Sequence, residues 1–279
     1  MEVRHEDLIG TFEQKRELVK QFNLMHDDFF AVVMRDKEPL EVVLRILLQK
    51  PDLVVQDVRV QYVMRNLGSH SVILDVFAED STGKLYNVEV QVENRDDHQK
   101  RVRYYQANMD TAFLNKGRHY SELPDLYLIF IASFDLFGDG LVCYEVERTL
   151  KHNRKVIDNG VHELYFNTKA DDSSEIAKLL HYFEHTDDSN NEFGALSDAV
   201  KRYKNTREGV SHVCDAVEKY GDQRAERAAA HAKALERIEL VANVMKNLNC
   251  PLEQALSILG ITPAEYQSCV DLLNERKSA

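Results

Sequence analysis

The alternation of hydrophobic and polar positions predicts the β-strands of this chain. Three β-rich runs, at about 53–65, 71–79 and 85–93, follow one another, and strand residues point alternately to the two faces of a sheet. The almost wholly apolar run at 124–135 is typical of a strand that is covered on both faces. Two more strands are expected near the segments 142–149 and 162–167.

Helical patterns precede and interrupt these strands. Residues 6–24 and the segment from Pro39 to Lys50 have helical patterns before the first strand, and a proline suits the first turn of a helix. A further helix is expected at 96–117, where acidic residues begin the segment and Gly117 ends it. The order of helix, three strands, helix and strand predicts a mixed sheet that is flanked by helices, hence an α/β fold.

The sequence changes in character after about residue 174. Residues 195–248 are mostly helical in pattern, and two short helices are expected around Gly260. We therefore expect a core domain at 1–186 and a helical C-terminal region at 187–279. A DNA-reading helix-turn-helix needs a basic recognition helix, whereas the last predicted helix is acidic until its final residues. Self-association into a homo-oligomer, or regulation, is the role that we expect for this region.

The predicted hairpin at 71–94 has carboxylates in the middle of its strands. A two-residue loop mixes charged and apolar side chains on both faces, whereas a three-residue loop that ends with a left-handed Gly83 separates them. In the second register Asp75 lies directly opposite Glu89. One face is then almost wholly apolar, and the other carries Asp75, Phe77, Glu79, Asn87, Glu89, Gln91 and Glu93.

The pairing of Asp75 with Glu89 poses an energetic problem, because like charges that face each other across two strands destabilise a sheet. Two interpretations remain open at this point. Either the carboxylates lie on a solvated face, where their repulsion costs little, or a cation lies between them. Hard divalent ions prefer oxygen ligands, and Mg²⁺ typically takes one or two protein carboxylates and keeps several waters.

Asp75, followed by Glu89, Val90 and Gln91 on the returning strand, resembles the active-site signature of the PD-(D/E)XK nuclease superfamily. Roughly residues 20–186 are similar to the PD-(D/E)XK nuclease family transposases, also described as recombination-promoting nucleases. The segments that carry this resemblance, in the same order, are "HDDFFAVVMRD", "LDVFAEDSTGKLYNVEVQ", "KRVRYYQA", "KGRHYSELPDLYLIFI" and "FDLFGDGLVCYEVER". The resemblance implies a restriction-endonuclease-like core with αβββαβ order.

The resemblance also implies a divalent-metal-dependent DNA endonuclease connected with recombination or transposition. Mg²⁺ is the expected metal, with Mn²⁺ as a substitute. Carried over by position, Asp75 and Glu89 are the expected metal ligands, with the Val90 carbonyl as a third, and Gln91 completes the catalytic set. Leu74 stands where the superfamily name has Pro.

Gln91 stands where the superfamily commonly has Lys, although Gln is common in the transposase branch. A lysine donates positive charge to the attacking water or to the phosphate, whereas a glutamine positions its neighbours by hydrogen bonds alone.

Three further side chains are weaker candidates. Glu41 is expected either to supply the extra acidic residue that such nucleases often place on their first core helix, or to be a solvated helix residue. Arg101 and Tyr105 lie four residues apart and share one face of a helix, and they match an R-x-x-x-Y element of the family. Arg101 is expected to contact DNA phosphate or to hold Glu89, with a packing or surface role as the alternative.

Charge and composition narrow the function classes. The chain has 279 residues and a net charge of -12, which argues against bulk electrostatic coating of nucleic acid but not against an enzyme with a local basic face or a bound cation. No apolar run approaches the roughly 20 residues of a membrane span. The four scattered cysteines predict reduced thiols and a cytoplasmic protein.

The alternatives to a nuclease are a nuclease-fold binding module with weak or lost catalysis and an interaction protein defined by its helical tail.

Overall fold

The computed structural model describes residues 11–64, 72–94, 97–114 and 116–274. Within these residues the chain forms a mixed six-stranded sheet with the order β1-β2-β3-β4-β6-β5. Strands β3, β4 and β6 run parallel, whereas β2 and β5 are antiparallel to β3 and β6. The strands are β1 (Val55–Met64), β2 (Val72–Asp80), β3 (Leu85–Gln91), β4 (Leu126–Ala132), β5 (Cys143–Val146) and β6 (Val161–Asn167).

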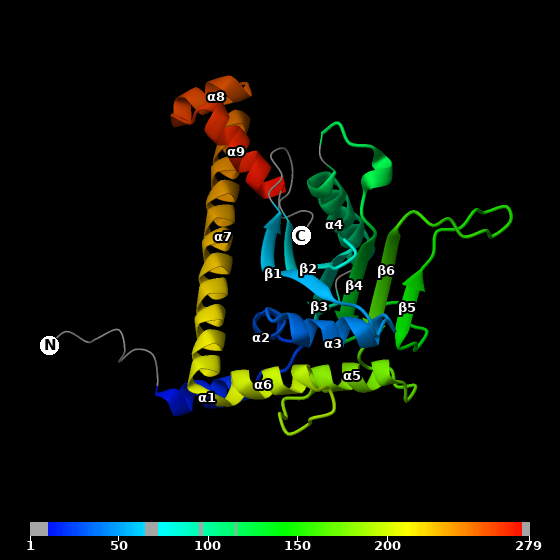
Figure 1. The fold of residues 1–279 in the computed structure, drawn as a ribbon. Coiled ribbons are helices and arrows are strands. Elements are labelled where there is room, and N and C mark those ends of the chain that lie inside the picture. The colour runs from blue at the N-terminus through cyan, green and yellow to red at the C-terminus, as the bar shows by residue number, and fades with distance from the viewer. Residues whose placement is uncertain (1–10, 65–71, 95–96, 115, 275–279) are drawn as a thin grey trace. The chain divides into compact units, whose positions relative to one another are not determined.

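Helices precede, interrupt and follow the sheet (Figure 1). The predicted α/β core of restriction-endonuclease type and the helical C-terminal region are both confirmed. Parts of the predicted elements, at residues 6–10, 65, 71, 96 and 115, lie outside the described residues. The helices are α1 (Phe12–Lys20), α2 (Asp27–Val33), α3 (Lys37–Leu47), α4 (His98–Phe113), α5 (Glu175–Glu184), α6 (Ala195–Asn205), α7 (Arg207–Leu248), α8 (Leu252–Leu259) and α9 (Pro263–Asn274), with a 3-10 turn at Tyr120–Glu122.

The hairpin of β2 and β3 has the predicted register. Val76 pairs with Val88 and Glu79 pairs with Leu85, and the same register sets Asp75 opposite Glu89. At the turn, the Gly83 N–H donates a 3.0 Å hydrogen bond to the Asp80 carbonyl. Gly83 has a φ of 82°, a left-handed conformation that glycine adopts without steric cost. The three-residue turn is therefore confirmed.

Helices cover both faces of the sheet. This arrangement bears on the interpretation that the carboxylates of the hairpin lie on a solvated face. Helix α4 lies on the face that carries Phe77 and Glu89, where the ring of Phe77 stacks on Phe113 with centroids 5.4 Å apart. On the opposite face, Tyr127 contacts Lys50, which follows α3; Figure 1 shows α3 and α4 on either side of the sheet. Glu89 is 2% exposed. The solvated-face interpretation is thus wrong for Glu89, because α4 removes it from water.

The chain divides into two compact units, of which the first comprises residues 1–64 and 73–217 and the second residues 65–72 and 218–279. In the first unit, Phe30 of α2 faces Phe183 of α5 with ring centroids 5.9 Å apart. The second unit has a small apolar core formed by Val241, Ala255 and Leu256, with Val244, Met245, Cys250, Leu252, Leu259, Ile261 and Tyr266 packed against it. The domain boundary after residue 186 and the self-association of the C-terminal region stay predictions.

Two predictions from composition bear on the chain as a whole. The cysteines at 143, 214, 250 and 269 are free thiols, as expected from their scattered positions. Among the described helices, none has both the length and the apolar character needed to cross a lipid bilayer.

Candidate active site

Asp75 on β2 and Glu89 on β3 form a pair of facing carboxylates. The Asp75 N–H donates a 3.1 Å hydrogen bond to Glu89 Oε1, and the Val90 N–H donates a 3.3 Å hydrogen bond to Asp75 Oδ2. From β1, Gln61 Nε2 donates to Asp75 Oδ1 at 3.4 Å. Each carboxylate thus accepts a main-chain donor of the other strand, so rigid backbone holds both acidic side chains.

Burial makes both carboxyl groups hard to ionise, because the charged form loses its hydration. Burial, together with the negative charge of Asp27, raises the pKa of Asp75 from 3.8 to about 7. Burial and the adjacent charge of Asp75 raise the pKa of Glu89 well above its usual range. Two neighbouring carboxyl groups in this state have a strong tendency to take up a proton or a cation.

Arg101 and Tyr105 of α4 lie close to this carboxylate pair. The Arg101 side chain is buried, and its guanidinium lies 5.8 Å from the ring centre of Phe130 and 5.9 Å from that of Tyr105. Its positive charge lowers the pKa of both Asp75 and Glu89 and partly offsets the effect of burial. Burial, and then the charge of Glu89, raise the pKa of the Tyr105 hydroxyl well above its usual range. The structure therefore brings both predicted residues to the pair, and Arg101 acts there as a buried counter-charge.

The charge of a third acidic residue, Asp27 of α2, acts on Asp75. The Asp27 carboxylate lies near enough for its charge to raise the pKa of Asp75. His26, Asp27 and Asp28 each offer a ligand atom, and these atoms lie within 4.8 Å of one another. The sequence analysis did not select Asp27, although "HDDFF" was among the segments that carried the family resemblance. The helix whose acidic residue acts electrostatically on Asp75 is α2, not the helix that contains Glu41.

Glu41 has a different role from the one that was predicted. Its Oε1 accepts a 2.8 Å hydrogen bond from the Val55 N–H, and its Oε2 forms a 2.9 Å ion pair with Arg45. These contacts lie at the beginning of β1, whereas Gln61, which contacts Asp75, lies near the end of that strand. Glu41 therefore links α3 to the beginning of β1 by a hydrogen bond. It does not lie beside the carboxylate pair, and it is not a solvated surface residue.

Residues 48–169 match the family model of the PD-(D/E)XK nuclease family transposases. The predicted resemblance is confirmed over this segment, which contains Asp75, Glu89, Arg101 and Tyr105, and it supports a nuclease- or transposase-related role. No curated protein and no solved structure matches the chain.

Gln91 departs from the lysine that gives the PD-(D/E)XK superfamily its name. Its Nε2 donates a 2.9 Å hydrogen bond to the Val90 carbonyl, the group predicted as a third metal ligand. Gln91 pairs with Ala132 of β4, which in turn pairs with Asn167 of β6. The amide thus orients a main-chain oxygen at the carboxyl end of β3, a task that needs a donor but no positive charge.

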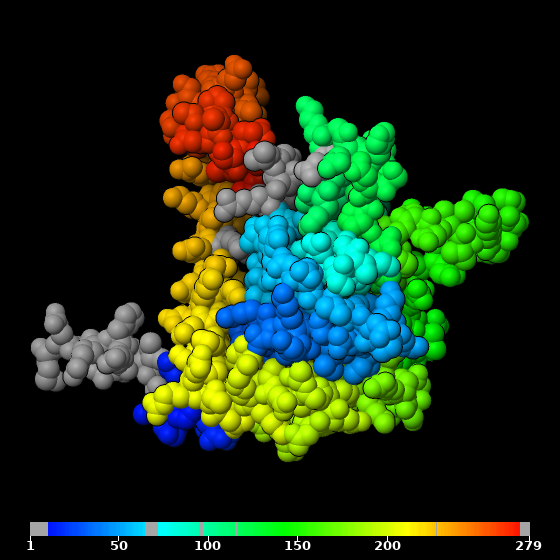
Figure 2. Space-filling model, in the orientation of Figure 1, coloured from blue at the N-terminus to red at the C-terminus, as the bar shows by residue number. Residues whose placement is uncertain are grey.

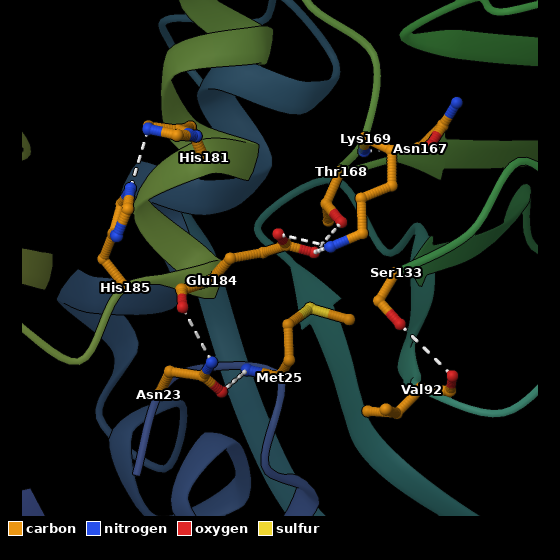
Figure 3. Close-up of polar contacts among 10 residues, drawn as sticks. All are labelled: Asn23, Met25, Val92, Ser133, Asn167, Thr168, Lys169, His181, Glu184 and His185. Carbon is orange, nitrogen blue, oxygen red and sulfur yellow. Dashed lines mark hydrogen bonds and ion pairs between the residues drawn. The ribbon is translucent and has the colours of Figure 1, made fainter. Parts of the chain in front are cut away.

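A polar network fixes the segment that leads into α2 against the carboxyl end of β6. Glu184 accepts a hydrogen bond from Thr168 Oγ1 and forms a 2.6 Å ion pair with Lys169. The Glu184 main-chain carbonyl accepts a 2.9 Å hydrogen bond from Asn23 Nδ2. Figure 3 shows Glu184 at the centre of these contacts. Because Asn23 lies only four residues before Asp27, the first residue of α2, the network limits the positions that Asp27 can take.

The residues at this site fit a hard divalent cation. PD-(D/E)XK nucleases generally use divalent metals, and such ions prefer carboxylate and carbonyl oxygens. Asp75, Glu89 and the Val90 main chain offer those oxygens, and the negative charge of Asp27 acts on Asp75. The raised pKa of the first two groups shows that their charges are poorly compensated by Arg101 alone, which is the condition that an added cation relieves.

Proposed function

We propose that this protein is a divalent-metal-dependent DNA endonuclease of the PD-(D/E)XK type that acts in recombination or transposition. The observation that carries the proposal is the carboxylate pair of the partly buried Asp75 and the buried Glu89, held face to face on adjacent strands within the segment that matches the family. Mg²⁺ is the proposed physiological cation, and Mn²⁺ is expected to substitute for it because both ions accept oxygen ligands.

Asp75, Glu89, Asp27 and the Val90 carbonyl would hold the cation. When bound, the cation makes a water molecule nucleophilic at neutral pH and stabilises negative charge on the scissile phosphate. Gln91 keeps the Val90 carbonyl oriented. Arg101 favours the ionised forms of both carboxyl groups, and α4 excludes bulk water from the face on which they lie, which strengthens electrostatic interactions there.

DNA is the proposed substrate, and the cytoplasm is the proposed location. Since the chain carries a net charge of -12, binding of a polyanion depends on local positive charge or on a bound cation rather than on the field of the whole protein. Self-association through the helical C-terminal region would bring two such sites together, as two cuts on one DNA require.

A second candidate function follows from Gln91. Because the amide lacks the positive charge that a lysine supplies, the protein would in this case be a nuclease-fold module that binds DNA with weak or no cleavage. Both candidate functions require DNA binding, but only the first includes efficient DNA cleavage.

The test is conversion of supercoiled plasmid by the purified full-length protein with Mg²⁺ or Mn²⁺. We expect nicked or linear product with either metal, and no product with EDTA or with Asp75→Ala. Glu79→Ala serves as the matched control, because it removes a carboxylate from the same strand at four residues' distance and should leave cleavage unchanged. Circular dichroism verifies that each variant is folded.

Two results would contradict the nuclease proposal. Cleavage that persists in folded Asp75→Ala would place the activity elsewhere or in a contaminant. Absence of conversion in both metals, together with retained binding of the plasmid, would favour the binding module instead.

A further inference from the structure

A hairpin between β5 and β6 stands out from the sheet. We call residues 147–158 the basic arm. Every residue of the arm is exposed. Figure 1 shows it as the green loop that extends beyond the ends of β5 and β6, and Figure 2 shows that no other described segment covers it in that view.

The basic arm has a defined backbone. Thr149 and Val156 form an antiparallel bridge. The Leu150 N–H donates a 2.9 Å hydrogen bond to the Lys155 carbonyl, and the Ile157 N–H donates a 2.8 Å hydrogen bond to the Arg148 carbonyl. The arm is therefore a short two-stranded ribbon rather than an irregular loop.

The arm concentrates positive charge on an acidic protein. It contains the cations Arg148, Lys151, Arg154 and Lys155 and the acids Glu147 and Asp158, so its formal charge is +4 − 2 = +2, against -12 for the chain. The two acids lie at its base and the four cations lie between them. A ribbon with this distribution presents its positive charge at the tip.

Within the part of the chain that the structure describes, the side chains of the four cations have no partner. Among the hydrogen bonds and ion pairs of the described residues, none involves the side chain of Arg148, Lys151, Arg154 or Lys155. In contrast, Arg45 of α3 forms an ion pair with Glu41, and Lys169, in the turn after β6, forms one with Glu184. Exposed and unpaired cations on an ordered ribbon are what a polyanionic partner requires.

We propose that the basic arm binds backbone phosphates of duplex DNA outside the cleavage site. A two-stranded β-ribbon fits the major groove, and Arg and Lys side chains on it reach the flanking phosphates. Since non-specific DNA binding is supplied by such charges, the arm provides attraction that the acidic remainder of the chain lacks. This inference rests on the proposed function.

The arm lies at a distance from the carboxylate pair. It rejoins the sheet at Val161, the first residue of β6, whereas Tyr165, four residues further along β6, lies in the row of Glu89. Four residues of a strand correspond to about 13 Å, and β4 lies between β6 and the strand that carries Glu89. The phosphates that the arm contacts are therefore different from the scissile phosphate, and the arm holds the duplex without taking part in the chemistry.

The experiment compares DNA binding by the full-length wild type and an arm variant, Arg148→Gln, Lys151→Gln, Arg154→Gln and Lys155→Gln. Affinity for a fluorescent duplex is measured in EDTA, which prevents cleavage, over a series of salt concentrations. Each lost phosphate contact reduces the slope of log K against log salt by about 0.9. We expect the slope of the arm variant to fall by about 2 to 4, with an affinity loss of 10-fold or more at low salt.

A matched variant removes the same charge elsewhere. Lys178→Gln, Lys219→Gln, Lys233→Gln and Lys246→Gln neutralises four exposed lysines on α5 and α7, and it should lower the slope by less than 1. Equal slopes and affinities for the arm variant and the wild type would overturn the proposal for the arm. If the wild type still cleaves plasmid in that case, the proposed function stands. A wild type that neither binds nor cleaves DNA would overturn both.

Discussion

The main-chain N–H of Asp75 donates a 3.1 Å hydrogen bond to the carboxylate of Glu89. In reverse, the Asp75 carboxylate accepts the N–H of Val90, the residue that follows Glu89. At Asp75 and Val90, the main-chain N–H groups therefore donate to a carboxylate of the neighbouring strand instead of to a main-chain carbonyl. The pair can be held rigidly in a buried position although its two members repel each other.

The first prediction concerns stability in the absence of metal. Since the folded pKa of Asp75 is about 7 against 3.8 in the unfolded chain, the folded state binds more protons between these values, and the free energy of unfolding falls as pH rises through this window. We expect Asp75 to lower the stability by roughly 2 to 4 kcal/mol at pH 8 relative to pH 4. Urea unfolding in EDTA at several pH values should therefore show a steeper decline for the wild type than for Asp75→Asn. Parallel profiles would contradict the burial of an ionisable Asp75.

The second prediction concerns metal addition. A cation that binds the folded state alone stabilises it by about 2.7 kcal/mol at 100 times its dissociation constant. We expect Mg²⁺ or Mn²⁺ at pH 8 to raise the melting temperature of the wild type by several degrees and to leave that of Asp75→Asn or Glu89→Gln nearly unchanged. The same titration with K⁺ at matched ionic strength is the control. An equal rise in all variants would place the metal elsewhere.

The third prediction separates Asp27 from Glu41. Asp27→Asn should lower cleavage by about 10- to 100-fold and weaken metal binding, because it replaces a negatively charged carboxylate by a neutral amide. Glu41→Ala should leave cleavage per folded molecule unchanged and lower the free energy of unfolding by about 1–3 kcal/mol, because the Val55 N–H loses its acceptor. The measurements are initial cleavage rates and urea unfolding of both variants. A loss of cleavage in Glu41→Ala with normal cleavage by Asp27→Asn would instead indicate that Glu41 is the third acidic residue of the site.

The fourth prediction uses the charge of Arg101. Its positive charge lowers the pKa of Glu89 and Asp75, so its removal raises both. Arg101→Gln should shift the acid limb of the pH profile of single-turnover cleavage to higher pH, with an intact fold by circular dichroism. Arg103→Gln, an exposed position on the same helix, is the control. A uniform loss of rate with an unshifted profile would make Arg101 a contact for DNA rather than a counter-charge.

The fifth prediction concerns Gln91. Gln91→Lys should keep or raise cleavage, because a lysine can donate to the Val90 carbonyl as the amide does and adds a positive charge near the scissile phosphate. Gln91→Leu, which has no donor, should lower it. Plasmid cleavage at equal protein concentration compares the three proteins. An inactive but folded Gln91→Lys would contradict the match of this position to the superfamily lysine.

The hairpin register was predictable because its determinants are local. A glycine that suits a left-handed turn and the alternation of side chains over two short strands leave one register that separates apolar from polar positions. That register paired Asp75 with Glu89 before any tertiary contact was known. Arg101 and Tyr105 were found for a similar reason, since their spacing on one helix is visible in the sequence.

Other features of the site depend on contacts between distant segments. The burial of Glu89 comes from α4 and could not be read from a strand pattern that looks half polar. Asp27 is separated from Asp75 by 75 − 27 = 48 residues, and the short α2 that carries it has no amphipathic repeat long enough to predict a helix. Glu41, on a longer and more regular helix, was therefore the more visible acid, although its side chain contacts β1 instead.

The hydrogen bonds from the Asp75 and Val90 amides to the two carboxylates make these amides spectroscopic reporters. When either carboxylate gains a proton or a cation, its oxygens become weaker acceptors, and the ¹⁵N and ¹H resonances of the two amides shift. Site occupancy can thus be followed by nuclear magnetic resonance in the intact chain, with no DNA present and no engineered probe.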